Sequence, residues 1–429
     1  MLDIKFIREN LKAVKEGAKN KNVKVDLDRL LELDEQKRKL QHEIDEMRST
    51  LKKSSKTKPS PEDIKTLKKL GEQIKALEDK YGKIEVECME LAYEVPNVPL
   101  SDVPVGKDET ENKVIREWGE IPKFDFVPKD HMEIGQHLDI IDTESAAKIS
   151  GARFAYLKGG AALLEFALIQ FTMEFLTSEK ELKKIADKFS YSDKPFVPVV
   201  PPVMIRPEIF VRMGRLSEAD KEERYYLQQD DQYLIGSAEH TLGPLHMDQS
   251  FNEADLPIRY IGFSTSFRRE AGTYGKDTKG IIRVHQFDKL EMETFTVPED
   301  SVKEQDFIVA IQEHLMQALE IPYRVVMICT GDMGKPDARQ IDIESWIPSQ
   351  NKYRETHTSD MMTDYQARRL NTKIRRKNGK TEYAHMNDAT AFAIGRTIIA
   401  ILENNQQKDG SVKIPKVLQK FVGKKVIKK

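Results

Sequence analysis

The chain has 429 residues, of which 33% are charged, 39% hydrophobic and 8% aromatic, and its formal net charge is −2. This length predicts two or three domains with room for a sizeable core. The near-zero charge excludes a globally basic nucleic-acid coat protein but leaves a local basic surface open. No apolar run approaches the roughly 18 residues of a membrane-spanning helix, and the charged start lacks the apolar stretch of a secretory signal. Cys88 and Cys329 give neither a disulfide framework nor zinc-ligand spacing, so we expect a reduced, cytoplasmic protein with no membrane partner.

Residues 27–95 predict a pair of long helices. Apolar residues recur at spacings of three, four or seven from Leu30 to Leu51 and in an unbroken 3-4 rhythm from Leu67 to Val95. This rhythm places one apolar seam on each helix, which is typical of a coiled coil. The serine- and proline-containing stretch between them stops the first helix and restarts the second. We therefore expect an antiparallel two-helix arm of about 45 Å.

The next segment, VPNVPLSDVPVGKDE (95–109), reads as an extended linker, because Pro96, Pro99 and Pro104 exclude a helix. Beyond it, short β-branched or aromatic runs (RFAYL, FVPVVPPVMI, YLIG, YIGFSTSF, VVMIC, IDIESWI) alternate with helical patterns near 159–188, 301–320 and 388–405. Several predicted strands follow one another directly. That order favours an α+β fold with an antiparallel sheet flanked by helices.

Residues 266–293 contain the densest cluster of chemically active side chains. Arg268 and Arg283 stand on either side of a glycine-rich loop, and planar guanidinium groups bind phosphate oxygens in pairs. On a strand, Arg283, Phe287 and Glu291 would share a face, because Phe287 is four residues after Arg283 and Glu291 is four residues after Phe287. The pattern indicates a nucleotide pocket with an aromatic ring beside it, or alternatively a surface hairpin with ordinary charge pairs. The chain has neither a P-loop nor a Rossmann glycine motif.

Two later segments add candidate ligands. Arg396 lies inside an apolar helical pattern, where it needs an anionic partner unless its side chain reaches the surface. Glu355 and Thr358 offer hard oxygen atoms suited to Mg²⁺ on phosphates, and the alternative reading is a solvated turn.

Taken together, these segments resemble the three motifs of the class II aminoacyl-tRNA synthetases. FVPVVPPVMI is similar to motif 1, whose proline (here Pro202) lies at the dimer interface; the arginine–loop–arginine pair is similar to motif 2, and the turn leading to GRT is similar to motif 3. More narrowly, the chain is similar to the seryl-tRNA synthetase family from end to end. The matching segments, in order, are MLDIKFIREN, the arm, the linker, SGARFAYLKGGAALLEFAL, FRREAGTYGKDTKGIIRVHQFDKLE and DYQARRLN.

The resemblance implies a ligase that joins serine to the 3′ end of serine tRNA through a seryl-adenylate, with ATP and Mg²⁺. It implies an N-terminal tRNA-binding domain (1–103) that carries the arm (27–95), and a catalytic domain (104–429). Arg268 and Arg396 are the implied catalytic residues. The implied ATP-binding residues are Arg268, Arg269, Glu270, Arg283, Phe287, Glu355, Thr356, His357, Thr358 and Arg396. The implied serine-binding residues are Ser237, Ala238, Glu239, Arg268, Glu291 and Thr390, and the implied Mg²⁺ ligands are Glu355 and Thr358.

The chain departs from the family pattern at several of these positions. Asp388 replaces the usual motif 3 asparagine, and Ser237 replaces a threonine. Thr356-His357-Thr358 and His240-Thr241-Leu242 are also unusual, and the stretch 213–232 differs from the common glycine-containing loop.

The resemblance also implies the partners. The arm would bind the long variable arm of serine tRNA, with selenocysteine tRNA as a further candidate, and Lys52, Lys53, Lys56 and Lys58 near its tip suit an RNA backbone. The lysine-rich C-terminal tail would add affinity or only solubility. The implied assembly is a homodimer through the motif 1 region. Two alternatives stay open: an amino acid–carrier-protein ligase of the same fold, which lacks such an arm, and a non-catalytic tRNA-binding relative.

Overall fold

The computed structural model describes residues 1–54, 61–271 and 280–429. Two of the lysines expected at the arm tip, Lys56 and Lys58, lie outside these described residues. The chain divides into two compact units, Met1–Val98 and Pro99–Lys429.

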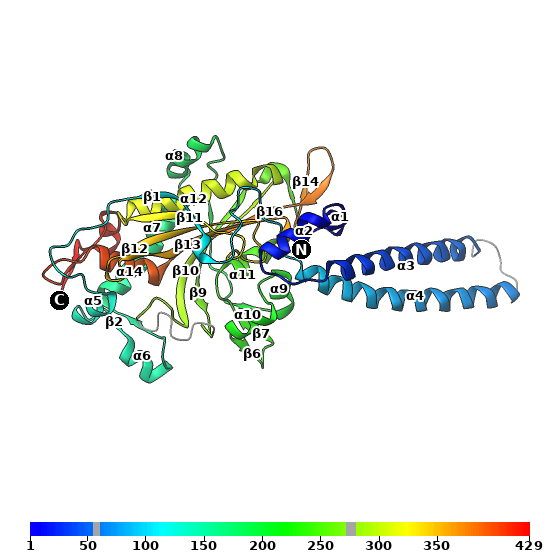
Figure 1. The fold of residues 1–429 in the computed structure, drawn as a ribbon, viewed down its shortest axis with the longest axis horizontal. Coiled ribbons are helices and arrows are strands. Elements are labelled where there is room, and N and C mark those ends of the chain that lie inside the picture. Colours follow the sequence, from blue (N-terminus) through cyan, green and yellow to red (C-terminus); the bar gives the residue numbers. More distant parts are fainter. Residues whose placement is uncertain (55–60, 272–279) are drawn as a thin grey trace. The chain divides into compact units, whose positions relative to one another are not determined.

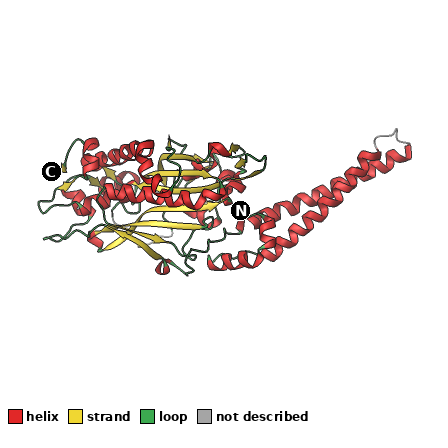
Figure 2. Ribbon diagram, turned by 90° about the horizontal axis from the view of Figure 1, so that it is seen from above, coloured by secondary structure: helices red, strands yellow, loops and turns green. Residues whose placement is uncertain are grey.

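The first unit is helical. Its helices are α1 (Ile4–Glu9), α2 (Leu11–Asn20), α3 (Leu27–Ser54) and α4 (Pro61–Glu94). The two long helices lie side by side in both views (Figures 1 and 2). The apolar seam is where the sequence predicts it, since Leu30, Leu33 and Ile44 of α3 and Ile74 and Ile84 of α4 are buried.

Ion pairs between these helices fix their relative direction. Arg29 pairs with Glu87, Lys37 with Glu85 and Arg48 with Glu78. As the α3 residue of the pair moves later in the sequence, its partner on α4 moves earlier. The two helices are therefore antiparallel. The predicted two-helix coiled-coil arm is confirmed.

The second unit is built on an eight-stranded sheet with the order β1-β11-β12-β13-β16-β10-β9-β4. Its strands are β1 (Lys113–Trp118), β4 (Val197–Val199), β9 (Ile258–Phe267), β10 (Gln286–Thr296), β11 (Tyr323–Met327), β12 (Arg339–Ile347), β13 (Lys352–Thr363) and β16 (His385–Ala393). Neighbouring strands pair antiparallel except at the edge, where β4 runs parallel to β9. The predicted α+β class with an antiparallel sheet is confirmed.

Helices α7 (Gly159–Leu176), α12 (Ser301–Ala318) and α14 (Ile394–Asn404) pack against the sheet. Their apolar side chains form one core with residues such as Leu290, Met292 and Ala391 of the central strands. On α12, Gln312 Nε2 donates to the carbonyl groups of Thr358 (3.0 Å) and Thr390 (2.8 Å), which ties this helix to two central strands. The opposite face of β10, β13 and β16 is left for the cavity described below.

Shorter elements complete the unit. The other helices are α5 (His131–His137), α6 (Thr143–Ser150), α8 (Glu179–Phe189), α9 (Pro207–Arg212), α10 (Glu218–Glu223), α11 (Glu239–Leu242), α13 (Tyr365–Leu370) and α15 (Gln419–Val422). The small strands are β2 (Ile141–Asp142), β3 (Tyr156–Leu157), β5 (Met204–Ile205), β6 (Tyr226–Leu227), β7 (Gln232–Leu234), β8 (Ser250–Asn252), β14 (Lys373–Arg375), β15 (Thr381–Tyr383), β17 (Val412–Lys413) and β18 (Val426–Ile427).

Two predicted helices differ in extent. The helix expected over 388–405 begins only at Ile394, because residues 388–393 belong to β16, a central strand buried on both faces. The run DATAFA (388–393) is rich in alanine, which favours a helix, and so short a run directly before a helix is hard to distinguish from its first turns by periodicity. The helix expected over 159–188 is two helices, because Ser178 caps α8 by accepting a hydrogen bond from the backbone of Glu181.

Helix α7 is long and apolar enough to pass a length-and-composition test for a membrane span, although 44% of it is buried inside the protein. Leu164, Ala167, Leu168 and Phe171 pack into the core of the second unit, as expected for a core helix of a folded domain. Its outer face carries Phe166, which is 60% exposed.

Candidate active site

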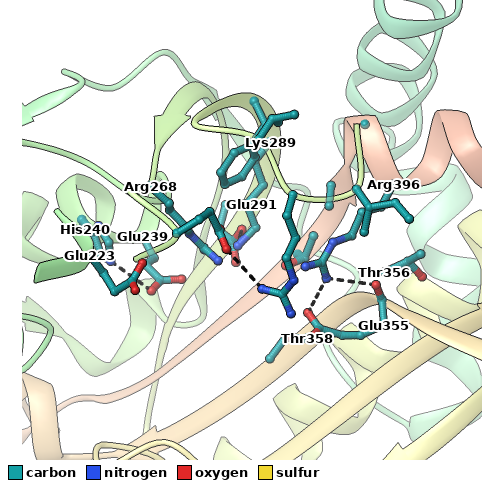
Figure 3. A pocket seen from close by; sticks show the side chains of 18 of the residues that line it. Glu223, Glu239, His240, Arg268, Lys289, Glu291, Glu355, Thr356, Thr358 and Arg396 are labelled. Carbon is teal, nitrogen blue, oxygen red and sulfur yellow. Dashed lines mark hydrogen bonds and ion pairs between the residues drawn. The ribbon is translucent and has the colours of Figure 1, made fainter. Parts of the chain in front are cut away.

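A cavity of about 440 Å³ lies on the face of β10, β13 and β16 that the core helices leave open. It is also lined by the segments that follow β9 and precede β10, by the start of α14, and by residues between α9 and the start of α11. Figure 3 shows Arg268 and Glu291 near its middle, Glu239 toward one end, and Arg396 with Glu355 toward the other. The lining is strongly charged, so the cavity suits a polar, charged ligand.

The register of β13 explains how Glu355 and Thr358 both reach the cavity although they are three residues apart. Strands β12 and β13 pair Ile343 with His357 and Glu344 with Glu355, so Thr356 is an extra residue in a β-bulge. A bulge shifts the in-and-out alternation by one residue. Glu355 and Thr358 therefore line the cavity, and the expected polar cluster is part of a strand and not a solvated turn.

The arginines expected to bind phosphate come from three places. Arg268 follows β9 directly, and its Nε donates to the carbonyl of Gly236 at 3.1 Å while its guanidinium lies over the ring of Phe287. Arg283 lies in the turn before β10, so the strand expected for it begins later, at Gln286. It still lines the cavity and pairs with Glu270 at 3.3 Å.

Arg396 enters the cavity from the first turn of α14. Its Nη1 donates to Oε1 of Glu355 at 2.9 Å. The anionic partner that the sequence requires for this arginine is thus Glu355, and Arg396 is not a core arginine reaching outward to solvent.

The protein holds Glu355 ionised. Loss of contact with water raises the pKa of Glu355, but the charges of Arg396 and Arg268 outweigh this effect and lower the pKa below its ordinary value. An ionised carboxylate and the Thr358 hydroxyl, which lines the same cavity, are oxygen ligands of the kind that could hold a hard cation such as Mg²⁺. The Thr358 hydroxyl also contacts Asp342 on the neighbouring strand, a second acid whose pKa burial raises well above normal.

The other end of the cavity is buried and acidic. Glu291 is 1% exposed and forms an ion pair with Lys289. Ser237 Oγ accepts from Lys289 Nζ at 3.0 Å and lies 3.4 Å from Oε2 of Glu291. Burial raises the pKa of Glu291 to about 7, while Lys289 pulls it down and Glu239 pushes it up. A carboxyl group poised near neutrality can exchange hydrogen bonds with a hydroxyl or an amino group.

Most residues expected from the sequence line this cavity. They are Arg268, Glu270, Arg283, Phe287, Glu355, Thr356, Thr358, Arg396, Glu239, Glu291 and Thr390. Four others do not line it: Arg269, His357, Ser237 and Ala238.

The structure gives a reason for each of these four placements. His357 points to the core, where its ring meets Phe392 and burial lowers its pKa to about 3. Arg269 lies over Tyr225. Ser237 reaches the site through Lys289 and Glu291, and Ala238 is fully buried beneath the cavity wall.

The sequence reading missed several lining residues. Lys289 could have been found, because it lies between Phe287 and Glu291 on a strand whose alternate residues share one face. The sequence marked His240 and the stretch 213–232 only as departures from the family pattern, and it gave no role to the lining residues there, which are Arg215, Asp220, Glu223, Arg224 and His240.

Comparison with known proteins gives the family of the chain. Residues 223–405 match the family model described as tRNA synthetase class II core domain (G, H, P, S and T), and residues 1–99 match the model of the seryl-tRNA synthetase N-terminal domain. The chain is 41% identical to a serine–tRNA ligase of Dictyoglomus turgidum (99% of this chain, 98% of the relative) and 40% identical to one of Nitrosopumilus maritimus (99% of both). It superimposes on the crystal structure of seryl-tRNA synthetase from Pyrococcus horikoshii complexed with ATP with a TM-score of 0.88, at 36% identity over 100% of this chain and 99% of that one.

The antiparallel sheet and the arginine-lined cavity on its open face thus define a class II aminoacyl-tRNA synthetase core. Both domains and the full-length relatives narrow the assignment further. The chain belongs to the seryl-tRNA synthetase family.

Proposed function

We propose that the chain is a serine–tRNA ligase acting in two steps. In the first, a carboxylate oxygen of L-serine attacks the α-phosphorus of ATP, and the bond to the departing pyrophosphate breaks. In the second, a ribose hydroxyl of the terminal adenosine of tRNA attacks the acyl carbon, loses its proton and releases AMP. Neither step needs a protein nucleophile, so catalysis comes from positioning and charge stabilisation. The observation that carries the proposal is one cavity that joins an arginine-lined end to a buried acidic end.

In this proposal ATP occupies the arginine-lined end. Arg268 lies between the two ends, where it can bridge the α-phosphate and the serine carboxylate. Arg283 and Arg396 bind the terminal phosphates. Phe287 stacks on the adenine ring and Glu270 accepts hydrogen bonds from its edge; the ring of Phe287 lines the cavity directly below the Arg268 guanidinium.

Mg²⁺ would be held by Glu355 and Thr358, whose oxygen atoms suit a hard cation. When bound, the ion neutralises negative charge on the phosphates. Arg396 then both orients the Glu355 carboxylate and contacts phosphate oxygens.

Serine occupies the acidic end. Glu291 and Thr390 recognise the small polar substrate, and Ser237, Ala238 and Glu239 form the loop beneath it. Buried groups that hydrogen-bond a hydroxyl reject analogues that lack it far better than an apolar pocket does. The 1% exposure of Glu291 supports this role, because a bound alanine would take the place of water at this buried carboxyl group without supplying the hydrogen bond that the serine hydroxyl supplies.

The N-terminal domain (1–103), with its arm, binds serine tRNA, and selenocysteine tRNA is a further candidate. Lys52 and Lys53 in the last turn of α3 are exposed, as are Lys65, Lys68 and Lys69 near the start of α4. This basic group, together with the lysine-rich tail, suits a phosphate backbone.

We also propose a cytoplasmic homodimer formed through the motif 1 region. Strand β4 is a sheet edge; its first residue, Val197, is 52% exposed, and Val200, which follows the strand, is 82% exposed. Helix α7 adds exposed Phe166 and Leu163. An apolar surface next to an open strand edge is a site for a second copy of the chain.

Serine-dependent exchange between ATP and labelled pyrophosphate tests the first step without tRNA. We expect exchange with serine and at least 100-fold less with alanine or glycine. Arg268→Ala should lower exchange at least about 100-fold while leaving thermal unfolding unchanged; Arg116→Ala, which removes a surface ion pair with Glu313, is the control. Transfer to a carrier-protein thiol in place of tRNA would favour the alternative ligase.

A further inference from the structure

Arg215 is an unusual side chain of the acidic end. It follows α9 in the stretch 213–232 that departs from the family pattern, and it is 16% exposed. Its guanidinium group contacts four carboxylates. These are Asp388 (3.2 Å), Glu239 (3.4 Å), Asp360 (3.4 Å) and Asp337 (3.8 Å).

Three acids converge beside this arginine. One carboxylate oxygen each from Glu239, Glu291 and Asp388 lie within 4.8 Å of one another; Glu291 and Asp388 are buried, and the Glu239 side chain is 12% exposed. Carboxylates this close repel one another strongly in a desolvated site. Arg215 contacts Glu239 and Asp388, and Lys289 contacts Glu291. Two cations from outside the trio therefore hold it together.

The charges of the trio depend on these cations. Arg215 holds the pKa of Glu239 well below its ordinary value although burial opposes it. Burial and the charge of Glu239 raise the pKa of Asp388, and Arg215 acts in the opposite direction. A change at Arg215 would thus alter both the direction and the charge of the two acids it contacts.

We propose that Arg215 is a positioning residue for the amino-acid substrate, and that it works through Asp388 and Glu239. By holding these two carboxylates beside Glu291, it forms the acidic face that receives the substrate's α-ammonium group. This inference rests on the proposed serine activation and names a determinant of serine affinity within it. It also connects two departures from the family pattern, since Asp388 stands in place of an asparagine and Arg215 comes from the altered loop.

The arginine–aspartate pair carries no net charge, and neither does a glutamine–asparagine pair. Replacing Arg215 alone leaves clustered acids without their cation, so they separate or take up protons. Replacing Asp388 alone leaves Arg215 with less counter-charge, which repels an incoming ammonium group. Replacing both restores the balance, and the two amide side chains can still hydrogen-bond each other. The inference therefore predicts strong coupling between the two positions.

The test compares Arg215→Gln, Asp388→Asn and the double variant of the full chain in pyrophosphate exchange. We expect each single variant to raise the KM for serine about tenfold, with the KM for ATP changed less than about twofold. The double variant should raise the KM for serine clearly less than the product of the two single effects, because the net charge of the site is restored while Glu239 still lacks its contact with Arg215. Arg215→Lys, which keeps the charge without the planar fork, should fall between the parent and Arg215→Gln.

Arg376→Gln is the matched control. Arg376 also holds three acids, Glu253, Glu299 and Glu382, but neither it nor these acids line the cavity. Thermal unfolding of all variants separates lost stability from lost affinity. The control should lose stability without a change in the KM for serine.

Several results would overturn the inference. Multiplicative effects in the double variant would show that the two positions act independently, and equal rises in the KM for serine and for ATP would indicate general damage. A Zn²⁺ requirement beyond Mg²⁺ would assign the acidic trio to a metal ion. If the parent itself shows no serine-dependent exchange, the proposed function fails; if the parent is active and the Arg215 variants match it, only this inference fails.

Discussion

Arg396 binds Glu355 through two separate acceptors: its Nη1 lies 2.9 Å from the carboxylate Oε1 and 3.0 Å from the main-chain carbonyl of the same residue. The contact joins the first turn of α14 to the central strand β13. It fixes the direction of the Glu355 side chain and helps to lower its pKa. A cavity-facing carboxylate that is already ionised and oriented needs little reorganisation to receive a divalent cation.

The first prediction concerns this carboxylate. Glu355→Gln keeps the shape of the side chain but removes its charge, so Mg²⁺ should bind more weakly. We expect the Mg²⁺ concentration for half-maximal pyrophosphate exchange to rise at least about tenfold, with a small change in the KM for serine. Exchange rates measured over a Mg²⁺ titration at fixed ATP check this.

Glu344→Gln is the control for this experiment. Glu344 lies directly opposite Glu355 on β12, but its carboxylate pairs with Arg324. Its replacement should leave the Mg²⁺ dependence as in the parent. Equal shifts in the two variants would mean that the general negative charge of the strands, and not a ligand at Glu355, attracts the ion.

The second prediction concerns pH. Burial raises the pKa of Glu291 to about 7, so the group is protonated and neutral below that pH and ionised above it. Only the ionised form balances a substrate ammonium group. The kcat/KM for serine should therefore rise as the pH increases through about 7 and then level off.

Glu291→Gln should lower the plateau and remove this rise, because an amide does not titrate. The KM for ATP, measured over the same pH range, serves as the internal reference. A rise that persists in the Glu291→Gln variant would place the titrating group elsewhere.

The third prediction concerns assembly. Phe166→Glu places a charge on the exposed face of α7, where the proposed dimer would bury it. Because a buried aromatic side chain often contributes much of the binding energy of an interface, this change should raise the dissociation constant of the dimer about 100-fold. Light scattering during gel filtration measures the mass. Val127→Glu, at a residue that is 86% exposed, should leave the mass unchanged. A Phe166→Glu variant with the mass of the parent would contradict the proposed interface.

Sequence reasoning reached the fold where a local pattern is repeated many times. The 3-4 rhythm of α3 and α4 predicts both helices because every turn repeats the same signal. It failed at β16, because the alanines among residues 388–393 favour a helix and so short a run shows too few alternations to outweigh them. It also could not foresee the bulge at Thr356, because a single extra residue in a strand has no sequence signature of its own.

The same contrast holds for the site. Arg268, Phe287 and Glu291 could be placed together because they follow one another along a single strand-loop-strand segment. Arg215 meets Asp388 only through the tertiary fold, across 173 positions of sequence. A charge in a loop is usually solvated, so nothing in the sequence marked Arg215 as buried among four acids.

The last prediction concerns the arm. Lys52, Lys53, Lys65, Lys68 and Lys69 are exposed near the tip end of the two long helices, far along the sequence from every cavity residue. Replacing these lysines with glutamine should raise the KM for serine tRNA at least about tenfold and flatten its salt dependence, because fewer counterions are released on binding. Serine-dependent pyrophosphate exchange should stay within about twofold of the parent, since it needs no tRNA. Glutamine at five exposed lysines that precede α3, namely Lys5, Lys12, Lys15, Lys19 and Lys24, is the matched charge control. If both sets of substitutions weakened tRNA charging equally, the arm tip would contribute only general charge, and its specific role in tRNA binding would be wrong.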